Sequence, residues 1–330
     1  MEKILSVSVA SYNLGDMIKT NIESFCNSSV ADKVELIITD DGSKDNTPEI
    51  VEEYVKKYPN VVKLIKKANE GPGSTVNSGI KHATGKYFRM VDGDDWVDTK
   101  NLEAFILFLE KTEADMVVSD YQVFDNQKQT IIEIIKYNLP IGNLVNFDDC
   151  YEQLPYEMHG VTFKTKIFQD NQIKLDNCFY TDVEYLLFPI PCVFTVAYFN
   201  YPIYVYRVAQ AGQSVSITSM KKNIDQHNLV LMHLLNWYIE NKLQLSFGKK
   251  YYITKRLSSM CDTQLGTLLL FTPSKEGKNK VKSFVKKIKN VDQEIYSLLK
   301  RGKKCKLLVC SNYILYPWVA KKFQKKRGNA

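Results

Sequence analysis

Three aspartates within four residues are the clearest chemical feature of this sequence. Asp92, Asp94 and Asp95 follow an apolar run that ends at Val91, and Gly93 separates the first two. Carboxylates one residue apart can offer oxygen atoms to a single hard cation, and Mg²⁺ or Mn²⁺ completes such a shell with phosphate oxygens and water. A polar turn is the alternative, because Asp and Gly are common turn residues. The pattern makes this segment a candidate divalent-cation site.

Two further polar segments have residue types suited to a nucleotide. Asp41 lies in an Asp-Asp-Gly-Ser run, where a carboxylate could accept a hydrogen bond from a base imide or a ribose; an Asx turn is the alternative. Asn69 and Gly71 lie in a glycine-rich segment before an expected helix. Glycine there permits close backbone approach, and a helix N-terminus favours phosphate. The segment matches neither a Walker loop nor GxGxxG, which argues against P-loop and dinucleotide enzymes.

The elements that must position these segments alternate between strands and helices over about the first 125 residues. The apolar runs predict strands at 6–10, 34–39, 61–65, 86–91 and 116–123, with helices between them. Thr47 is expected to cap the second helix, with Pro48 as its first residue. Such alternation predicts an α/β fold, with a mostly parallel sheet and helices on both faces. Ligands of such sheets bind at the carboxyl ends of strands, where both acidic segments fall.

Together these motifs resemble those of family 2 glycosyltransferases, which have the GT-A fold and invert the sugar's configuration. The resemblance is carried by segments 8–13, 40–43, 69–71, 77–80 and 85–96, in the family's order and spacing. It implies a bacterial polysaccharide-type member that uses a nucleotide diphosphate sugar, which we expect to be a UDP-sugar. Its cofactor would be Mn²⁺ or Mg²⁺.

The resemblance also implies roles for single residues. Ala10 and Tyr12 would line the nucleoside pocket, with Tyr12 against the base, and Asp41 would hold the uracil ring. Asp92 would contact the ribose or a metal-bound water, and Asp94 would ligate the metal. The donor-binding residues that we predict are Ala10, Tyr12, Asp41, Asn69, Gly71, Asp92, Gly93 and Arg207.

One departure from the family concerns the segment 75–77. Members often have Ala-Arg-Asn there, whereas this chain has Thr-Val-Asn. A cation near the donor is therefore missing from that position, and Lys81 and Arg89 are the candidates to replace it.

Residues 156–216 resemble a second part found in bacterial members, where an Asp before an amphipathic helix is the catalytic base. That role passes to Asp182, with Glu184 as the alternative because Thr181 replaces the usual acidic neighbour. Without the resemblance, an Asp that stabilises the first helical turn would be the simpler interpretation.

Arg207 and His159 complete the predicted site. Arg207 could bind a phosphate through two parallel hydrogen bonds, or it could pair with a surface carboxylate. His159 lies where contacts with the acceptor are expected, although a lone histidine is more often structural.

These roles suggest a division of the chain. Residues 1–218 would form the GT-A domain, with a nucleotide-sugar half at 1–125 and an acceptor and catalytic-base half at 126–218. Residues 219–330 would form a mainly helical region that ends in a basic tail, with helices near 221–245, 251–271 and 278–300.

Composition points to a cytoplasmic protein. An apolar content of 45% and a charged content of 25% are ordinary for a globular chain. The seven cysteines include no CxxC pair, which fits reduced thiols better than a disulfide framework or a zinc site. We find no signal peptide and no apolar run long enough to cross a bilayer.

The net charge of +7 is unevenly distributed. Residues 275–330 contain 17 Lys and Arg against 3 Asp and Glu, and basic clusters there bracket an apolar, aromatic stretch. Two interpretations stay open: 301–330 could bind an anionic membrane surface on the inner face of the cell membrane, or it could pack on the body with a solvated lysine face.

We therefore expect a glycosyltransferase that moves a sugar from its nucleotide donor to a glycan or lipid-linked glycan acceptor in polysaccharide or glycoconjugate biosynthesis. The reaction would be direct displacement with Asp182 as the base. The alternatives are a nucleotidyltransferase that acts on sugar phosphates and a non-catalytic membrane- or RNA-binding protein. The basic tail has few interleaved aromatic residues, so we expect no nucleic-acid partner.

Overall fold

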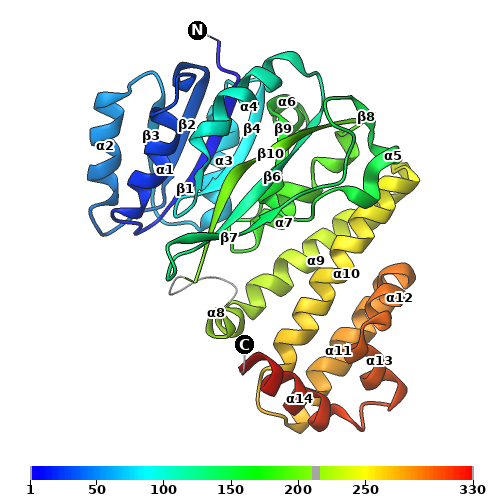
Figure 1. The fold of residues 1–330 in the computed structure, drawn as a ribbon. Coiled ribbons are helices and arrows are strands. Elements are labelled where there is room, and N and C mark those ends of the chain that lie inside the picture. The colour runs from blue at the N-terminus through cyan, green and yellow to red at the C-terminus, as the bar shows by residue number, and fades with distance from the viewer. Residues whose placement is uncertain (1, 210–215, 329–330) are drawn as a thin grey trace. The chain divides into compact units, whose positions relative to one another are not determined.

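The computed structural model describes residues 2–209 and 216–328 of the chain. These form two compact units, Met1–Gln210 and Ala211–Ala330 (Figure 1). The predicted boundary between residues 218 and 219 stays a prediction.

The first unit contains all the strands that the structure describes. They are β1 (Leu5–Ser11), β2 (Val34–Asp40), β3 (Val62–Lys66), β4 (Tyr87–Asp92), β5 (Trp96–Val97), β6 (Met116–Asp125), β7 (Thr130–Ile135), β8 (Val145–Asn146), β9 (Val161–Lys164) and β10 (Thr195–Val208). Its helices are α1 (Met17–Cys26), α2 (Thr47–Lys57), α3 (Pro72–His82), α4 (Thr99–Lys111), α5 (Phe147–Cys150), α6 (Thr165–Asp170) and α7 (Thr181–Leu187). Short 3₁₀ helices are η1 (Ala31–Lys33), η2 (Tyr151–Gln153), η3 (Met158–Gly160) and η4 (Ile190–Cys192).

The strands form one sheet in the order β3-β2-β1-β4-β9-β6-β10-β5, with β7 beside β6 and β8 beside β10. The strands β3, β2, β1 and β4 are parallel, whereas β9 runs antiparallel to both of its neighbours. All seven residues of β2 are buried, as expected for a strand covered on both faces. Helices lie on both faces of the sheet (Figure 1), which confirms the predicted fold class.

The register of the sheet brings the two acidic segments to one edge. Ala10 of β1 lies between Thr39 of β2 and Asp92 of β4, and Ser11 lies beside Asp40. Because these strands are parallel, their carboxyl ends meet at the same edge. The loops that follow β2 and β4 therefore begin on either side of the end of β1.

The N-cap prediction for α2 was wrong. The helix begins at Thr47, and Asn46 occupies the capping position without a side-chain bond to the helix. The Thr47 hydroxyl instead accepts hydrogen bonds from the backbone N–H groups of Leu14 and Gly15, at 2.9 and 2.8 Å. It thereby fixes the loop that follows β1, and this contact joins residues more than thirty positions apart.

The second unit is helical throughout its described part. Its elements are α8 (Ile217–Lys222), α9 (Ile224–Asn241), η5 (Lys242–Gln244), α10 (Phe247–Leu269), α11 (Lys275–Val291), α12 (Gln293–Arg301), α13 (Lys303–Cys310) and α14 (Tyr316–Gly328). The helix expected near 278–300 is two helices, because the Asp292 carboxylate caps α12 by accepting from the N–H groups of Glu294 and Ile295. Among the described residues, no helix is both long and apolar enough to cross a bilayer.

The donor half depends on close packing of α3 against β1. A Cβ atom added to Gly79 would overlap the Ser8 side chain of β1, so the helix can lie this close only with glycine at that position. Ala has a higher helix propensity than Gly by about 1 kcal/mol, but this gain cannot offset an overlap in a packed core.

We expect Gly79→Ala to destabilise the fold by about 1–3 kcal/mol, because α3 must move away from the sheet. Urea unfolding followed by circular dichroism measures the loss. Ser78→Ala, one residue earlier on the same helix, is the matched control and should leave the midpoint nearly unchanged. Equal midpoints for Gly79→Ala and the parent chain would contradict the packing argument.

Candidate functional site

A tight turn after β4 holds the three aspartates. A Cβ atom on Gly93 would lie 2.6 Å from the backbone oxygen of Ala10 and would overlap the Leu14 side chain. Glycine is therefore required between Asp92 and Asp94. The three carboxylates each place an oxygen within 4.8 Å of the others.

The three carboxylates have different partners. Asp95 is buried, and its two oxygens accept hydrogen bonds from the Tyr204 hydroxyl at 2.5 Å and from the Arg207 backbone N–H at 2.7 Å. Asp92 and Asp94 are half-buried. Asp95 is thus committed to the protein, and the other two carboxylates are better placed to meet a ligand.

Burial disfavours the charged forms of all three acids. Burial, followed by repulsion from the carboxylates of Asp94 and Asp182, raises the pKa of Asp92 to about 8. Burial also raises the pKa of Asp94 and of Asp95. A divalent cation would relieve this repulsion, and an all-oxygen donor set suits Mg²⁺ or Mn²⁺. The residues present therefore fit the metal that the resemblance implies.

Two side chains from distant segments hold the backbone of this turn. The Asn21 amide of α1 donates to the backbone oxygens of Asp92 and Asp95, at 3.2 and 2.9 Å. Arg207 donates from Nε to the backbone oxygen of Asp94 at 2.7 Å and from Nη1 to Asn126 at 2.9 Å. Its guanidinium also lies 4.6 Å from the centre of the Trp96 ring. The structure thus gives the Arg207 side chain contacts within the turn, where the sequence suggested a phosphate or a surface carboxylate.

The second acidic segment organises the glycine-rich loop. Asp41 is buried, and its carboxylate accepts from the N–H groups of Glu70 and Gly71, at 3.0 and 2.9 Å. Lys67 pairs with Asp41 at 2.8 Å and also donates to the Ser74 hydroxyl at the start of α3. Lys67 is thus a cation that links Asp41 to the start of α3.

The remaining predicted donor residues are spread along the same edge. Ala10 is half-buried near the end of β1, and Tyr12 follows it with 46% of its side chain exposed. Asn69 is exposed, and its backbone N–H lies close to Gly42 in the neighbouring loop. Gly71 has a φ of +97°, which favours glycine, and packs against the backbone of Asn177.

Neither candidate replacement cation reaches this edge as we expected. Arg89 is fully buried, and donates to the hydroxyls of Thr162 and Ser119 and to the backbone oxygen of His159. Lys81 lies exposed in the last turn of α3, far along the helix from its N-terminus.

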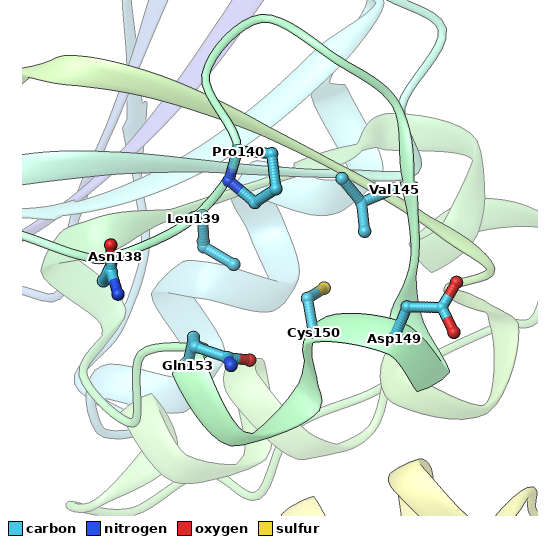
Figure 2. Close-up of a pocket in the computed structure, with 7 residues that line it drawn as sticks. All are labelled: Asn138, Leu139, Pro140, Val145, Asp149, Cys150 and Gln153. Atoms are coloured by element: carbon cyan, nitrogen blue, oxygen red, sulfur yellow. The ribbon is translucent and has the colours of Figure 1, made fainter.

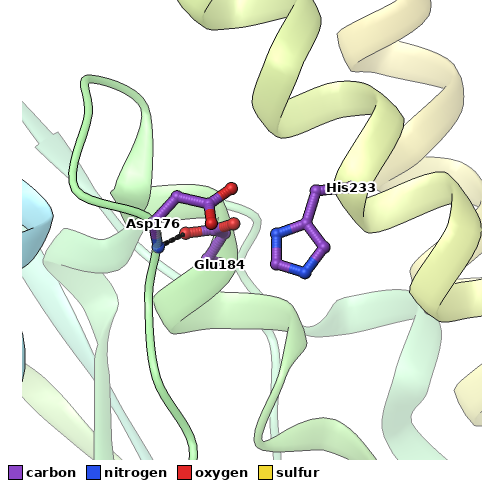
Figure 3. A group of neighbouring side chains, drawn as sticks. All are labelled: Asp176, Glu184 and His233. Atoms are coloured by element: carbon purple, nitrogen blue, oxygen red, sulfur yellow. Dashed lines mark hydrogen bonds between the residues drawn. The ribbon is translucent and has the colours of Figure 1, made fainter.

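The two candidate bases differ in their surroundings. Asp182 is half-buried in the first turn of α7, after Tyr180 in a left-handed conformation with φ +72°. Its carboxylate is near enough to Asp92 to contribute to the raised pKa of that acid. Glu184 is fully buried and accepts from the Asp176 backbone N–H at 2.7 Å (Figure 3). Burial raises the pKa of Glu184 to about 8.

Three tyrosine rings surround the imidazole of His159. Its imidazole stacks on Tyr206 with centroids 4.3 Å apart, and the rings of Tyr204 and Tyr121 lie 4.7 and 5.1 Å away. Burial, together with the charge of Arg89, lowers the pKa of His159 to about 3. The ring is therefore neutral near pH 7. It adjoins the Tyr204 that bonds to Asp95, so this predicted acceptor residue lies beside the acidic turn.

A separate hollow of about 380 Å³ lies near the opposite end of β10 (Figure 2). Its lining residues are Asn138, Leu139, Pro140, Val145, Asp149, Cys150 and Gln153. Val145 of β8 pairs with Val196 near the start of β10, whereas Arg207 lies near its end. This hollow is not part of the acidic site.

Sequence reasoning missed Asn21 and Lys67 as parts of the site, and it assigned Asp95 and Tyr204 no separate roles. Lys67 carried a signal, because it lies two residues before Asn69 in the glycine-rich loop. The sequence did not distinguish the role of Asp95 from those of Asp92 and Asp94. Asn21 lies 71 positions from Asp92, and no local pattern marks it. Tyr204 lies 112 positions from Asp92, so its contact with the turn is not visible in the sequence.

Comparison with known proteins agrees with this geometry. The family model "Glycosyl transferase family 2" matches residues 6–172. EpsH of Bacillus subtilis is 38% identical over 117 residues, which cover 36% of this chain and 33% of EpsH. The poly(ribitol-phosphate) beta-glucosyltransferase of Bacillus spizizenii is 28% identical over 171 residues, which cover 51% of this chain and 26% of that protein. The matches thus span a third or less of these two relatives.

Solved structures support the fold. S. aureus TarS 1–349, crystallised in complex with UDP-GlcNAc, superposes with a TM-score of 0.68 at 16% identity, over 98% of this chain and 92% of that one. The mannosyltransferase PcManGT of Pyrobaculum calidifontis, in complex with GDP-Man and Mn²⁺, gives a TM-score of 0.51 at 14% identity.

The fold is therefore of the GT-A type, with a helical C-terminal region. Since the family model covers half of the chain and includes the acidic turn, the Asp41 segment and the glycine-rich loop, this chain belongs to glycosyl transferase family 2.

Proposed function

We propose that the chain is an inverting glycosyltransferase that moves a sugar from a UDP-sugar to a glycan or lipid-linked glycan acceptor. The observation that carries this proposal is the juxtaposition of two half-buried acids of the β4 turn with Asp182, at the carboxyl edge of the sheet. The acids of the turn can hold the leaving diphosphate through a cation, and Asp182 can accept a proton.

Asp94, with Asp92 beside it, would hold the divalent cation. When bound, Mn²⁺ or Mg²⁺ neutralises charge on the departing nucleoside diphosphate. The nucleoside itself would lie against Ala10 and Tyr12. The loop that Asp41 orders through Gly71 would offer its backbone to the donor. Asn69 of the same loop and Gly93 of the turn after β4 would also contact the donor. The UDP-GlcNAc complex of TarS supports a uridine donor.

Asp182 would act as the general base. It accepts the proton of the acceptor hydroxyl while that oxygen attacks the anomeric carbon and the bond to the diphosphate breaks. Glu184 is a poorer candidate, because its carboxylate is fully buried and holds the backbone N–H of Asp176. His159 would contribute a flat, neutral surface to the acceptor side.

Arg207 would serve the donor site at least in part by holding Asp94 in place. Its Nε–H holds the backbone oxygen of Asp94, and its own backbone N–H holds Asp95. Arg207 is therefore proposed as a positioning residue that fixes the direction of the metal-binding carboxylates.

The first test is donor binding. In a panel of nucleotide sugars with Mn²⁺, a UDP-sugar should raise the melting temperature, since a ligand that binds only the folded state stabilises it. We expect Asp94→Ala to lose this shift and to transfer no sugar, because the metal loses its main ligand.

Asp98→Ala serves as a control for the loss of an aspartate nearby. Asp98 caps α4 by accepting from the N–H groups of Lys100 and Asn101. Its replacement should lower stability by about 1 kcal/mol but keep the donor-dependent shift. A full Mn²⁺-dependent rise in the melting temperature of Asp94→Ala would contradict the metal assignment. The donor proposal would be wrong if no nucleotide sugar raised the melting temperature of the parent chain.

The second test separates the two candidate bases. Asp182→Asn keeps the side-chain shape but cannot accept a proton, so turnover should fall by roughly 10²-fold or more. Donor affinity, measured by calorimetry, should hardly change. UDP release after acceptor addition measures turnover.

Glu184→Gln is the matched variant on the same helix. Its amide oxygen can still accept from Asp176, so turnover should stay within a few-fold of the parent chain. A dead Glu184→Gln beside an active Asp182→Asn would reverse the assignment.

A further inference from the structure

The last two helices of the second unit each expose a stripe of basic and apolar side chains. On α13 the exposed residues are Lys303, Lys306, Leu307 and Cys310, at a spacing that places them on one face of a helix. On α14 the exposed residues Trp318, Lys321, Lys322 and Lys325 have the same spacing. The opposite faces are already used: Cys305 and Leu308 of α13, and Tyr316, Val319 and Ala320 of α14, are buried.

The turn between these helices adds large apolar side chains to the same stretch. Ile314 is 74% exposed and Leu315 is 41% exposed. The N–H groups of Ile314 and Leu315 donate to the backbone oxygen and the hydroxyl of Ser311, which makes the turn compact. With Leu307 and Trp318, four large apolar residues thus reach solvent within twelve positions. Such concentrated exposure is unusual on a surface with no partner.

The charge of this stretch has one sign. No Asp or Glu follows Glu294, whereas ten Lys and Arg lie between residues 300 and 327. Lys304 pairs with Asp262 at 2.9 Å. In the described part of the chain, no carboxylate lies within ion-pair distance of Lys303, Lys306 or the exposed lysines of α14. The Lys322 ammonium lies 4.8 Å from the Trp318 ring centre, so the aromatic and basic groups intermingle.

We propose that α13, the 311–315 turn and α14 form a docking surface for an anionic lipid bilayer. The lysines would meet lipid headgroups, Trp318 would lie at the headgroup level, and Ile314 and Leu315 would enter the boundary of the acyl chains. A nucleic acid would match the charge, but it offers nothing to cover Ile314, Leu315 and Leu307. The combination of exposed aliphatic and basic side chains therefore favours lipid. This surface goes beyond the transferase proposal and does not depend on it.

Point substitutions in the full-length chain test this surface better than a truncation. Deleting the two helices would uncover the core beneath Tyr316 and Ala320 and would confuse unfolding with loss of binding. The wild-type chain should sediment with phosphatidylglycerol vesicles at low salt, stay in the supernatant with phosphatidylcholine vesicles, and detach at high salt. The Trp318 emission should shift to the blue on binding, and Trp318→Phe should abolish that shift.

Two paired variants separate charge from insertion. Lys321→Gln with Lys322→Gln should weaken vesicle binding by roughly thirtyfold, since each basic residue contributes on the order of 1 kcal/mol at an anionic surface. Ile314→Ser with Leu315→Ser should weaken it at least tenfold while melting temperature is unchanged. Matched controls are Lys286→Gln with Lys287→Gln on exposed positions of α11, and Leu243→Ser at a residue 88% exposed. Both controls should bind as the wild type does.

Several results would overturn the proposal. The wild-type chain could stay in the supernatant with anionic vesicles at low salt. The Ile314 and Leu315 variant could bind as tightly as the parent, which would leave charge as the sole contribution. Polyuridylate could compete equally well against the parent and the apolar variant, which would identify a soluble polyanion as the ligand. If the α11 control weakens binding as much as the α14 variant, the location is wrong.

Discussion

The hydrogen bonds to Asp95 are the constraint on which the rest of the site depends. Its carboxylate joins the turn after β4 to β10, through the Tyr204 hydroxyl and the Arg207 backbone N–H. With those partners in place, Arg207 can return its side chain to the backbone oxygen of Asp94. Asp95 is buried, and a buried carboxylate without donors would be costly. These bonds fix Asp95 in the turn, and Asp92 and Asp94 remain half-buried beside it.

The second acidic segment also contains an aspartate whose carboxylate binds a neighbouring element. Asp41 binds the loop before α3 through two backbone N–H groups and Lys67, much as Asp95 binds β10. One aspartate of each acidic segment thus holds a neighbouring element, which is the strand β10 for Asp95 and the glycine-rich loop for Asp41. Acidic motifs at strand ends serve two purposes here: some carboxylates build the edge of the sheet, and others remain for ligands. Residue type alone does not separate the two purposes.

The sequence predicted the strands of the donor half closely, because each is a short apolar run between polar turns, and because parallel strands must end at a common edge. It failed where the decisive contacts are distant. Thr47 looked like a helix cap, but its hydroxyl accepts hydrogen bonds from the loop after β1, and no local pattern showed that Arg207 donates to the backbone of Asp94. The long strand β10 was not predicted, and its burial does not alternate: two buried stretches, 196–199 and 203–205, are separated by three less buried residues. The tail could be read in two ways, and the structure shows why: each helix has one packed face and one exposed basic face.

The Asp95–Tyr204 bond also has a consequence for the order of folding. It joins residues 109 positions apart, so closing it costs more chain entropy than a local contact does. During synthesis, a chain that has emerged as far as α4 already contains every acidic residue of the turn, but it lacks both donors to Asp95. All the acidic residues of the turn are therefore synthesised before the residues of β10 that bind Asp95. The site is complete only when β10 is in place, since both donors to Asp95 belong to that strand, and its completion therefore depends on a non-local contact.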